Sequence, residues 1–134
     1  GERIDRPEDF PHAFRRLGEK MDIFLMAADP LAYSMENVAW LEARCLQDRL
    51  LCLAPSRNAA KLGILLAVDV DSEGIGDQAA ALVSRILDHG ENPAAIGVVP
   101  PLGTRLILNM RTAQRIGLPV QSQLLSVVSE VIAP

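Results

Sequence analysis

The chain has 134 residues, of which 49% are hydrophobic and 4% aromatic, and its 13 basic and 17 acidic side chains give a net charge of −4. This length suits one domain with a buried core, and the aliphatic bias favours parallel strands under helices over an antiparallel sandwich. No cluster of Lys and Arg is present to neutralise phosphates, and no apolar run is long enough to span a bilayer. The composition therefore argues against nucleic-acid binding and against a membrane-spanning segment.

Helices and strands are expected to alternate along the first half of the chain. Apolar residues recur on one helical face from Phe10 to Leu17, with Pro7 suited to the first turn. Ser34 can cap a second helix, and Gly63 can end a third. The predicted elements are a helix over residues 8–19, a strand over 21–27, a helix after Ser34, a strand over 50–55, a short helix over 56–62 and a strand over 64–70.

The second half continues the same alternation. Ser72 is the expected cap of a long helix that ends at Gly90, and residues 95–100 are expected to form a strand or a crossing segment. Asn109 caps a helix that Gly117 ends. The remaining predicted elements are a strand over residues 105–109, helices over 110–116 and 122–128, and a terminal strand from 130. The pattern predicts an α/β fold, a three-layer, mostly parallel sheet with helices on both faces.

Two stretches, residues 64–87 and 105–120, carry a recognisable order of elements. An apolar strand leads to D-x-x-x-x-G and a long helix, then to G-x-x-P, a crossing strand and L-V-x-N-L-K-T-A-x-x-x-G-L. The positions on this pattern are Asp71, Gly76, Gly90, Pro93, Leu106, Asn109, Thr112, Ala113, Gly117 and Leu118. The chain thus resembles the substrate-binding component of bacterial ABC importers, in the periplasmic-binding-protein-like (type I) branch whose best-known members bind aromatic amino acids.

The resemblance implies that residues 1–134 form a single domain, part of the C-terminal lobe of a two-lobed protein. The N-terminal lobe and the first strand and helix of this lobe would lie outside the chain, and residues 72–90 would pack on the N-terminal lobe. It also implies capture of a small molecule, such as an amino acid, between the lobes, delivery to an ABC permease and a periplasmic or other extracytoplasmic location. Neither catalysis nor a cofactor is expected.

Three residues are candidates for contacting a ligand. Asp29 ends a predicted strand at the position of an acid that lines the family's cleft, where a carboxylate can hold an ammonium group. The alternative is a turn aspartate before Pro30 that accepts hydrogen bonds from its own backbone. Ser56 follows the next strand at a small polar position of the cleft; the alternative is that it serves only as a helix cap and needs no ligand.

Asp71 ends the third predicted strand, and the residues after it depart from the family. Ser72 and Glu73 stand where the family usually has two tyrosines. Because aromatic rings provide stacking surface, their loss indicates either a more polar ligand or a cleft that no longer binds. A second hypothesis is therefore a degenerate domain used for sensing or protein–protein interaction, and a homodimer through an exposed sheet edge is a related expectation.

The two cysteines, Cys45 and Cys52, fall on a predicted helix and a predicted strand. The simpler interpretation is two buried, unpaired side chains; the alternative is a disulfide, which an extracytoplasmic family permits.

Other chemistries find little support in the sequence. Gly74, Gly76 and Ala79 formally match a dinucleotide-binding pattern, but three acidic residues crowd the turn where a pyrophosphate would sit. His12 and His89 lie in no metal-ligand spacing, and no nucleophile motif of an enzyme is present. A nucleotide-binding enzyme is consequently the weakest of the three hypotheses.

Overall fold

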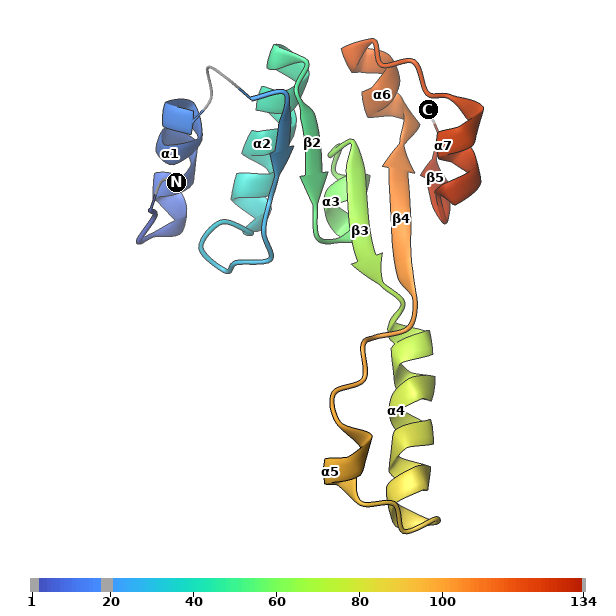
Figure 1. The fold of residues 1–134 in the computed structure, drawn as a ribbon. Helices are drawn as coiled ribbons and strands as arrows, with labels where there is room; N and C mark the ends of the chain where they lie inside the picture. Colours follow the sequence, from blue (N-terminus) through green and yellow to red (C-terminus); the bar gives the residue numbers. More distant parts are fainter. Residues whose placement is uncertain (1–2, 18–20, 134) are drawn as a thin grey trace. The chain divides into compact units, whose positions relative to one another are not determined.

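The computed structural model describes residues 3–17 and 21–133, which divide into two compact units (Figure 1). The first unit runs to Asp69 and resumes at Leu106, whereas Val70–Arg105 form the second. In chain order the elements are a 3-10 helix η1 (Pro7–Asp9), α1 (Phe10–Leu17), β1 (Ile23–Leu25), α2 (Met35–Asp48), β2 (Leu51–Ala54), α3 (Arg57–Lys61), β3 (Leu66–Val70), α4 (Ser72–Leu87), α5 (Pro93–Ile96), β4 (Thr104–Asn109), α6 (Met110–Ile116), α7 (Ser122–Val127) and β5 (Glu130–Ile132).

The strands form one sheet in the order β1-β2-β3-β4-β5. The pairs β1–β2, β2–β3 and β4–β5 are parallel. Figure 1 draws β4 in the direction opposite to β3, and the backbone N–H of Asn109 donates to the carbonyl of Leu65 at 2.8 Å where these strands meet. The expected α/β class with a mostly parallel sheet is confirmed.

Different helices pack on the two faces of the sheet. On the first face, Phe24, Cys52 and Ala54 join a core cluster with side chains from α1, α2 and α3. On the second face, Leu108 packs in another cluster with Leu51, Leu66 and residues from α6, α7 and the loop between them. Since consecutive strand residues point to opposite faces, each strand contributes to both layers of helices. This arrangement is the predicted three-layer order.

Local sequence signals place most helix ends correctly. The Ser34 hydroxyl accepts a hydrogen bond from the N–H of Asn37 at 3.1 Å, and the Ser56 hydroxyl accepts one from Ala59 at 3.3 Å. Asn109 caps α6 through the N–H of Thr112, and Gly117 ends this helix at a φ of 75°, where glycine avoids steric strain. The helix expected over residues 8–19 begins as η1 and continues as α1; its last two expected residues lie outside the described part.

One local expectation needs correction, and another is decided between its two alternatives. The long helix α4 has Asp71 at its N-cap position, one residue before the expected Ser72. Residues 95–100 form no strand, because Pro93 and Asn92 start the short helix α5 instead. Proline has the backbone angle required at the first helical position, and the side-chain oxygen of Asn92 accepts the N–H of Ala94 at 3.0 Å. The segment after α5 leads back to β4 as an irregular crossing segment.

The second unit has little core of its own. Neither α4 nor α5 contains a buried residue, and Leu87 is 75% exposed. The Gln78 side chain joins α4 to the returning segment, donating to the carbonyl of Pro100 at 2.8 Å and accepting from the N–H of Leu102 at 2.9 Å. Arg85 and Glu91 pair at 2.6 Å, and this hydrogen bond from the guanidinium lowers the pKa of the exposed Glu91 carboxyl.

The cysteines are joined in a disulfide, so the simpler expectation of two unpaired side chains is wrong in this structure. Cys45 lies near the end of α2 and Cys52 in β2, and both are buried in the first-face cluster. Their Cα atoms are 6.3 Å apart, within the range that a disulfide can span. The reversal between α2 and β2 brings the two residues together, which their sequence spacing of 7 did not by itself require.

Candidate ligand-binding site

Asp29 lies just beyond the carboxyl end of β1, as predicted. Its carboxylate accepts hydrogen bonds from the backbone N–H of Leu31 at 2.8 Å and of Ala32 at 3.4 Å. These bonds are those of a turn aspartate, the alternative interpretation from sequence. The residue is nevertheless exposed, so its second carboxylate oxygen stays available to a positively charged group.

Ser56 lies at the carboxyl end of the neighbouring strand β2. Besides capping α3, its hydroxyl forms a hydrogen bond with the hydroxyl of Tyr33. The backbone N–H of Tyr33 in turn donates to the carbonyl of Asp29 at 2.7 Å. Tyr33 therefore connects Asp29 to Ser56, and these two predicted residues belong to one local assembly.

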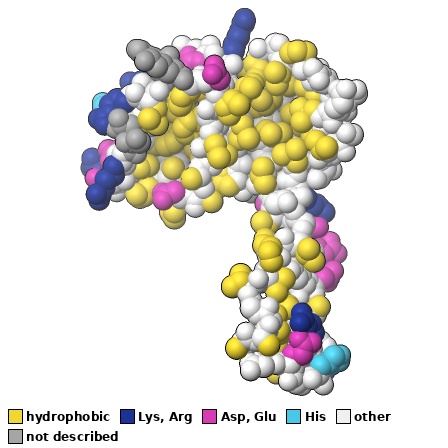
Figure 2. All heavy atoms as spheres, viewed as in Figure 1, with side chains coloured by type: hydrophobic (Ala, Val, Ile, Leu, Met, Phe, Trp, Pro, Cys, Tyr) yellow, Lys and Arg dark blue, Asp and Glu magenta, His cyan; other side chains and the backbone are white. Residues whose placement is uncertain are grey.

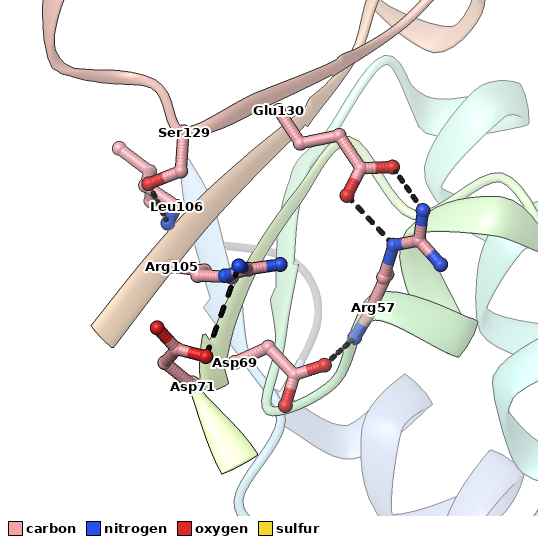
Figure 3. Close-up of polar contacts among 7 residues, drawn as sticks. All are labelled: Arg57, Asp69, Asp71, Arg105, Leu106, Ser129 and Glu130. Carbon is pink, nitrogen blue, oxygen red and sulfur yellow. Dashed lines mark hydrogen bonds and ion pairs between the residues drawn. The ribbon is translucent and has the colours of Figure 1, made fainter. Parts of the chain in front are cut away.

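Arg57 is a charged residue of this edge that the sequence did not single out. Its guanidinium forms two hydrogen bonds of 2.7 Å to the carboxylate of Glu130 in β5, and its backbone N–H donates to the carboxylate of Asp69 at 2.8 Å (Figure 3). The hydrogen bonds to Glu130, with the attraction of its charge, raise the pKa of Arg57, which stays positively charged. This ion pair ties α3 to β5 across β3 and β4.

Asp71, the third predicted residue, belongs to the second unit. Its carboxylate lies 3.7 Å from the guanidinium of Arg105, and its backbone N–H donates to the carbonyl of Gly103 at 2.8 Å. Figure 3 shows the Asp71–Arg105 pair. Within its own unit, Asp71 thus connects the start of α4 to the segment that leads from α5 to β4. This structural role is separate from any contact with a ligand.

A cavity of about 240 Å³ opens beside Asp29, between α1 and β1. Most of its wall is apolar, and three phenylalanine rings contribute to it. The lining residues are Ile4, Phe10, Ala13, Phe14, Leu17, Phe24, Asp29, Leu31 and Ala32. Among the described residues of this lining, Asp29 is the one ionisable side chain, and this part of the wall favours an apolar occupant.

Tyr33, Arg57 and Glu130 are the contacts that sequence reasoning missed at this edge. Tyr33 and Arg57 are near Asp29 and Ser56 in sequence, and this proximity could have suggested them. Glu130 is 73 residues from Arg57, so no local pattern could have suggested it. Within residues 3–17 and 21–133 we find no group of three acidic, histidine or cysteine side chains able to hold a metal ion. In the same part of the chain, no helix is long and apolar enough to cross a membrane.

Solved structures show the same fold. A conserved domain protein from Vibrio cholerae has 19% identity and a TM-score of 0.72, over 96% of this chain and 43% of that chain. An ABC domain from Streptococcus pneumonia in complex with L-Trp has 16% identity and a TM-score of 0.72, over 96% and 44%. A ligand-free, open substrate-binding protein with adhesive properties from Clostridium difficile has 18% identity and a TM-score of 0.75, over 98% and 43%.

The chain therefore spans less than half the length of these three proteins. Comparison with curated proteins gives no match. The family model for ABC transporter substrate binding proteins, by contrast, matches residues 3–132, nearly the whole chain. With the parallel sheet and the polar strand ends already described, this match shows that the chain belongs to the ABC transporter substrate-binding protein family.

Proposed function

We propose that this chain is part of the C-terminal lobe of the solute-binding component of an ABC importer. The observation that carries the proposal is the family match over residues 3–132. Consistent with it, Asp29 and Ser56 lie at the carboxyl ends of adjacent parallel strands, where ligands of open α/β sheets bind. The protein acts by binding rather than by catalysis, delivers its ligand to a permease and works outside the cytoplasm.

The proposed ligand is a small molecule with a positively charged group, such as an amino acid. Asp29 would accept hydrogen bonds from the ammonium group, Ser56 would bond a neutral polar group, and Asp71 is proposed as a third ligand residue. Exposed apolar residues of the second unit would pack on the N-terminal lobe. Those that are at least half exposed are Val83, Leu87, Val98 and Leu102. The cleft is then completed only in the longer polypeptide.

The test is calorimetric titration of a panel of amino acids into the full-length polypeptide that contains this chain. Asp29→Asn is expected to weaken binding of the ligand about tenfold or more, because it removes the charge of a charge-assisted hydrogen bond. Asp22→Asn is the matched control, since Asp22 is an exposed aspartate just before β1, at the opposite end of that strand. Unchanged affinity in the Asp29→Asn protein would contradict the assigned role.

Residues 1–134 alone are expected to bind the same ligand weakly or not at all, because they provide one side of the cleft. Micromolar affinity of this chain for an amino acid would refute the interpretation that it provides only one side of the cleft. The family assignment would stand.

A second candidate function is a domain used for sensing or protein–protein interaction. The observation in its favour is that Asp29 and Ser56 already have internal hydrogen-bond partners. Full-length protein that binds no amino acid in the titration above, yet unfolds cooperatively, would favour this function. The homodimer through a sheet edge remains a prediction, which light scattering tests.

A further inference from the structure

Arg57 and Glu130 form their ion pair at the edge of the sheet where Asp29 and Ser56 lie. Arg57 directly follows Ser56, at the carboxyl end of β2. β4 runs opposite to β3 and parallel to β5, so the amino end of β5, which begins at Glu130, lies at this same edge. A cation therefore stands next in the chain to one predicted ligand residue and one strand away from another.

The geometry of this pair is the one that arginine uses to hold a carboxylate. Nε and Nη2 of Arg57 donate to the two carboxylate oxygens of Glu130, each at 2.7 Å, and the two side chains are 44% and 27% exposed. Ion pairs that are open to water stabilise a fold only slightly, because the solvent screens the attraction. The planar fork of N–H groups also fits the carboxylate of a small molecule.

The charges of this edge suit a ligand that carries both signs. Hydrophobic side chains predominate on the face of the first unit seen in Figure 2, and the charged ones lie mainly toward its margins. At the strand ends, Asp29 has a carboxylate oxygen available for a positive group, and Arg57 has a guanidinium for a negative one. An ammonium and a carboxylate group thus each find a partner of opposite charge after adjacent strands.

We propose that Arg57 holds the carboxylate of the ligand and that Glu130 occupies the guanidinium until the ligand replaces it. The ligand class is then a zwitterion, with its ammonium group at Asp29. Exchange of one carboxylate for another keeps two charge-assisted hydrogen bonds on Arg57, whereas a neutral group in that place would lose them. This inference rests on the proposed function and adds the residue that selects the negative end of the ligand.

A purely structural pair, which only ties α3 to β5, behaves differently on substitution. Either Arg57→Gln or Glu130→Gln removes such a pair, so the two changes would then have the same effect. In the proposed exchange their effects are opposite. Arg57→Gln removes the group that binds the ligand carboxylate, whereas Glu130→Gln removes the charge that competes with it.

The test is calorimetric titration of the full-length polypeptide with the tightest-binding amino acid of the panel and with its carboxamide, which lacks the negative charge. Arg57→Gln should weaken binding of the amino acid about tenfold or more and change binding of the carboxamide about twofold or less. Glu130→Gln should strengthen binding of the amino acid about threefold or more. Arg57→Lys keeps the charge without the fork and should give an intermediate affinity.

Arg44→Gln is the matched control for these substitutions. Arg44 pairs with Asp48 at 2.7 Å near the end of α2, which precedes the amino end of β2, so it lies away from the strand ends that hold Asp29 and Ser56. Its replacement should leave both affinities unchanged. Thermal unfolding of each variant at the wild-type midpoint establishes that a change in affinity is not a loss of fold.

Equal weakening by Arg57→Gln and Glu130→Gln would overturn the inference and leave the pair a structural link. So would a wild-type protein that binds the amino acid and its carboxamide equally well. Amino-acid binding persists in both of these results, so the proposed function would stand. A wild-type protein that binds no amino acid of the panel would instead refute the proposed ligand and this inference with it.

Discussion

At the residue scale, the polar side chains that follow β1 and β2 form hydrogen bonds within the protein itself, without a ligand. Asp29 stabilises a turn, Ser56 caps a helix and bonds Tyr33, and Arg57 pairs with Glu130. Such partners hold each side chain in one orientation, which lowers the entropic cost of binding a ligand. A structural role and a binding role are therefore compatible at Asp29 and Ser56.

Asn109 shows how much one buried side chain can connect. It is 3% exposed, its carbonyl oxygen accepts the N–H of Thr112 at 3.1 Å, and its amide nitrogen donates to the carbonyl of Ala60 at 2.8 Å. Asn109→Ala removes the cap of α6 and leaves a buried carbonyl without this partner, so the free energy of unfolding should fall by about 2–3 kcal/mol. Denaturant unfolding followed by circular dichroism measures the loss.

The control for this substitution is Asn92→Ala. Asn92 caps α5 by the same type of bond, to Ala94 at 3.0 Å, but it is exposed and its bond is open to water. Its replacement should cost about 1 kcal/mol or less. Equal losses for the two substitutions would show that the bond to Ala60 contributes nothing.

At the scale of elements, the contact between α2 and β2 is covalent as well as hydrophobic. The disulfide closes a short loop around the left-handed turn at Arg49, which has a φ of 54°. Ser56 follows β2 directly, so the disulfide also holds one predicted ligand residue in place relative to α2. The oxidised pair agrees with the proposed extracytoplasmic location, because disulfides persist in oxidising compartments.

Reduction of this disulfide should lower the free energy of unfolding by about 2 kcal/mol, the loop-closure contribution expected for a sequence separation of 7. Unfolding with and without dithiothreitol measures the difference, and the Cys45→Ala/Cys52→Ala double variant should not respond to the reductant. Two titratable thiols in the unreduced, denatured protein would show that the bond does not form.

At the scale of the whole molecule, the chain combines a packed unit with a poorly buried one. The described residues of the first unit form three core clusters, whereas none of the residues from Val70 to Arg105 is buried. Helix stability in proteins comes mainly from tertiary packing, so α4 depends on a partner surface more than α2 does. The exposed apolar residues of α4 agree with the proposal that this unit covers the other lobe.

Amide hydrogen exchange should therefore be faster throughout α4 than in α2, although α4 is the longer helix. Protection of α2 should approach the global stability, while α4 opens locally at lower cost. Exchange followed by mass spectrometry in residues 1–134 alone measures this difference. Equal protection in the two helices would show that the second unit is stable by itself.

The sequence alone determined the class of the fold and most helix ends. Alternating apolar runs predicted the five strands, and Ser34, Ser56, Asn109 and Gly117 marked helix boundaries, because caps depend on neighbouring backbone groups. For residues 95–100 the sequence left a strand or a crossing segment open, and the structure has no strand there, because Asn92 and Pro93 begin a helix. Asp29, Ser56 and Asp71 were placed correctly at strand ends, but their ligand role remains a prediction.

Only the tertiary structure decided which distant residues meet. No local sequence pattern relates the residues that meet in the Arg57–Glu130 pair, the Tyr33–Ser56 bond and the disulfide. Nor does one predict that β4 runs opposite to β3. The exposure of Ile23 and Leu25 in β1 is likewise a result of the fold. A strand covered by a helix and an uncovered strand can have the same apolar sequence pattern. Only the register and the position of the helices show that Leu25 is exposed while Leu108 is covered. Caps and periodicity are local in the chain, whereas packing depends on which elements the fold brings together.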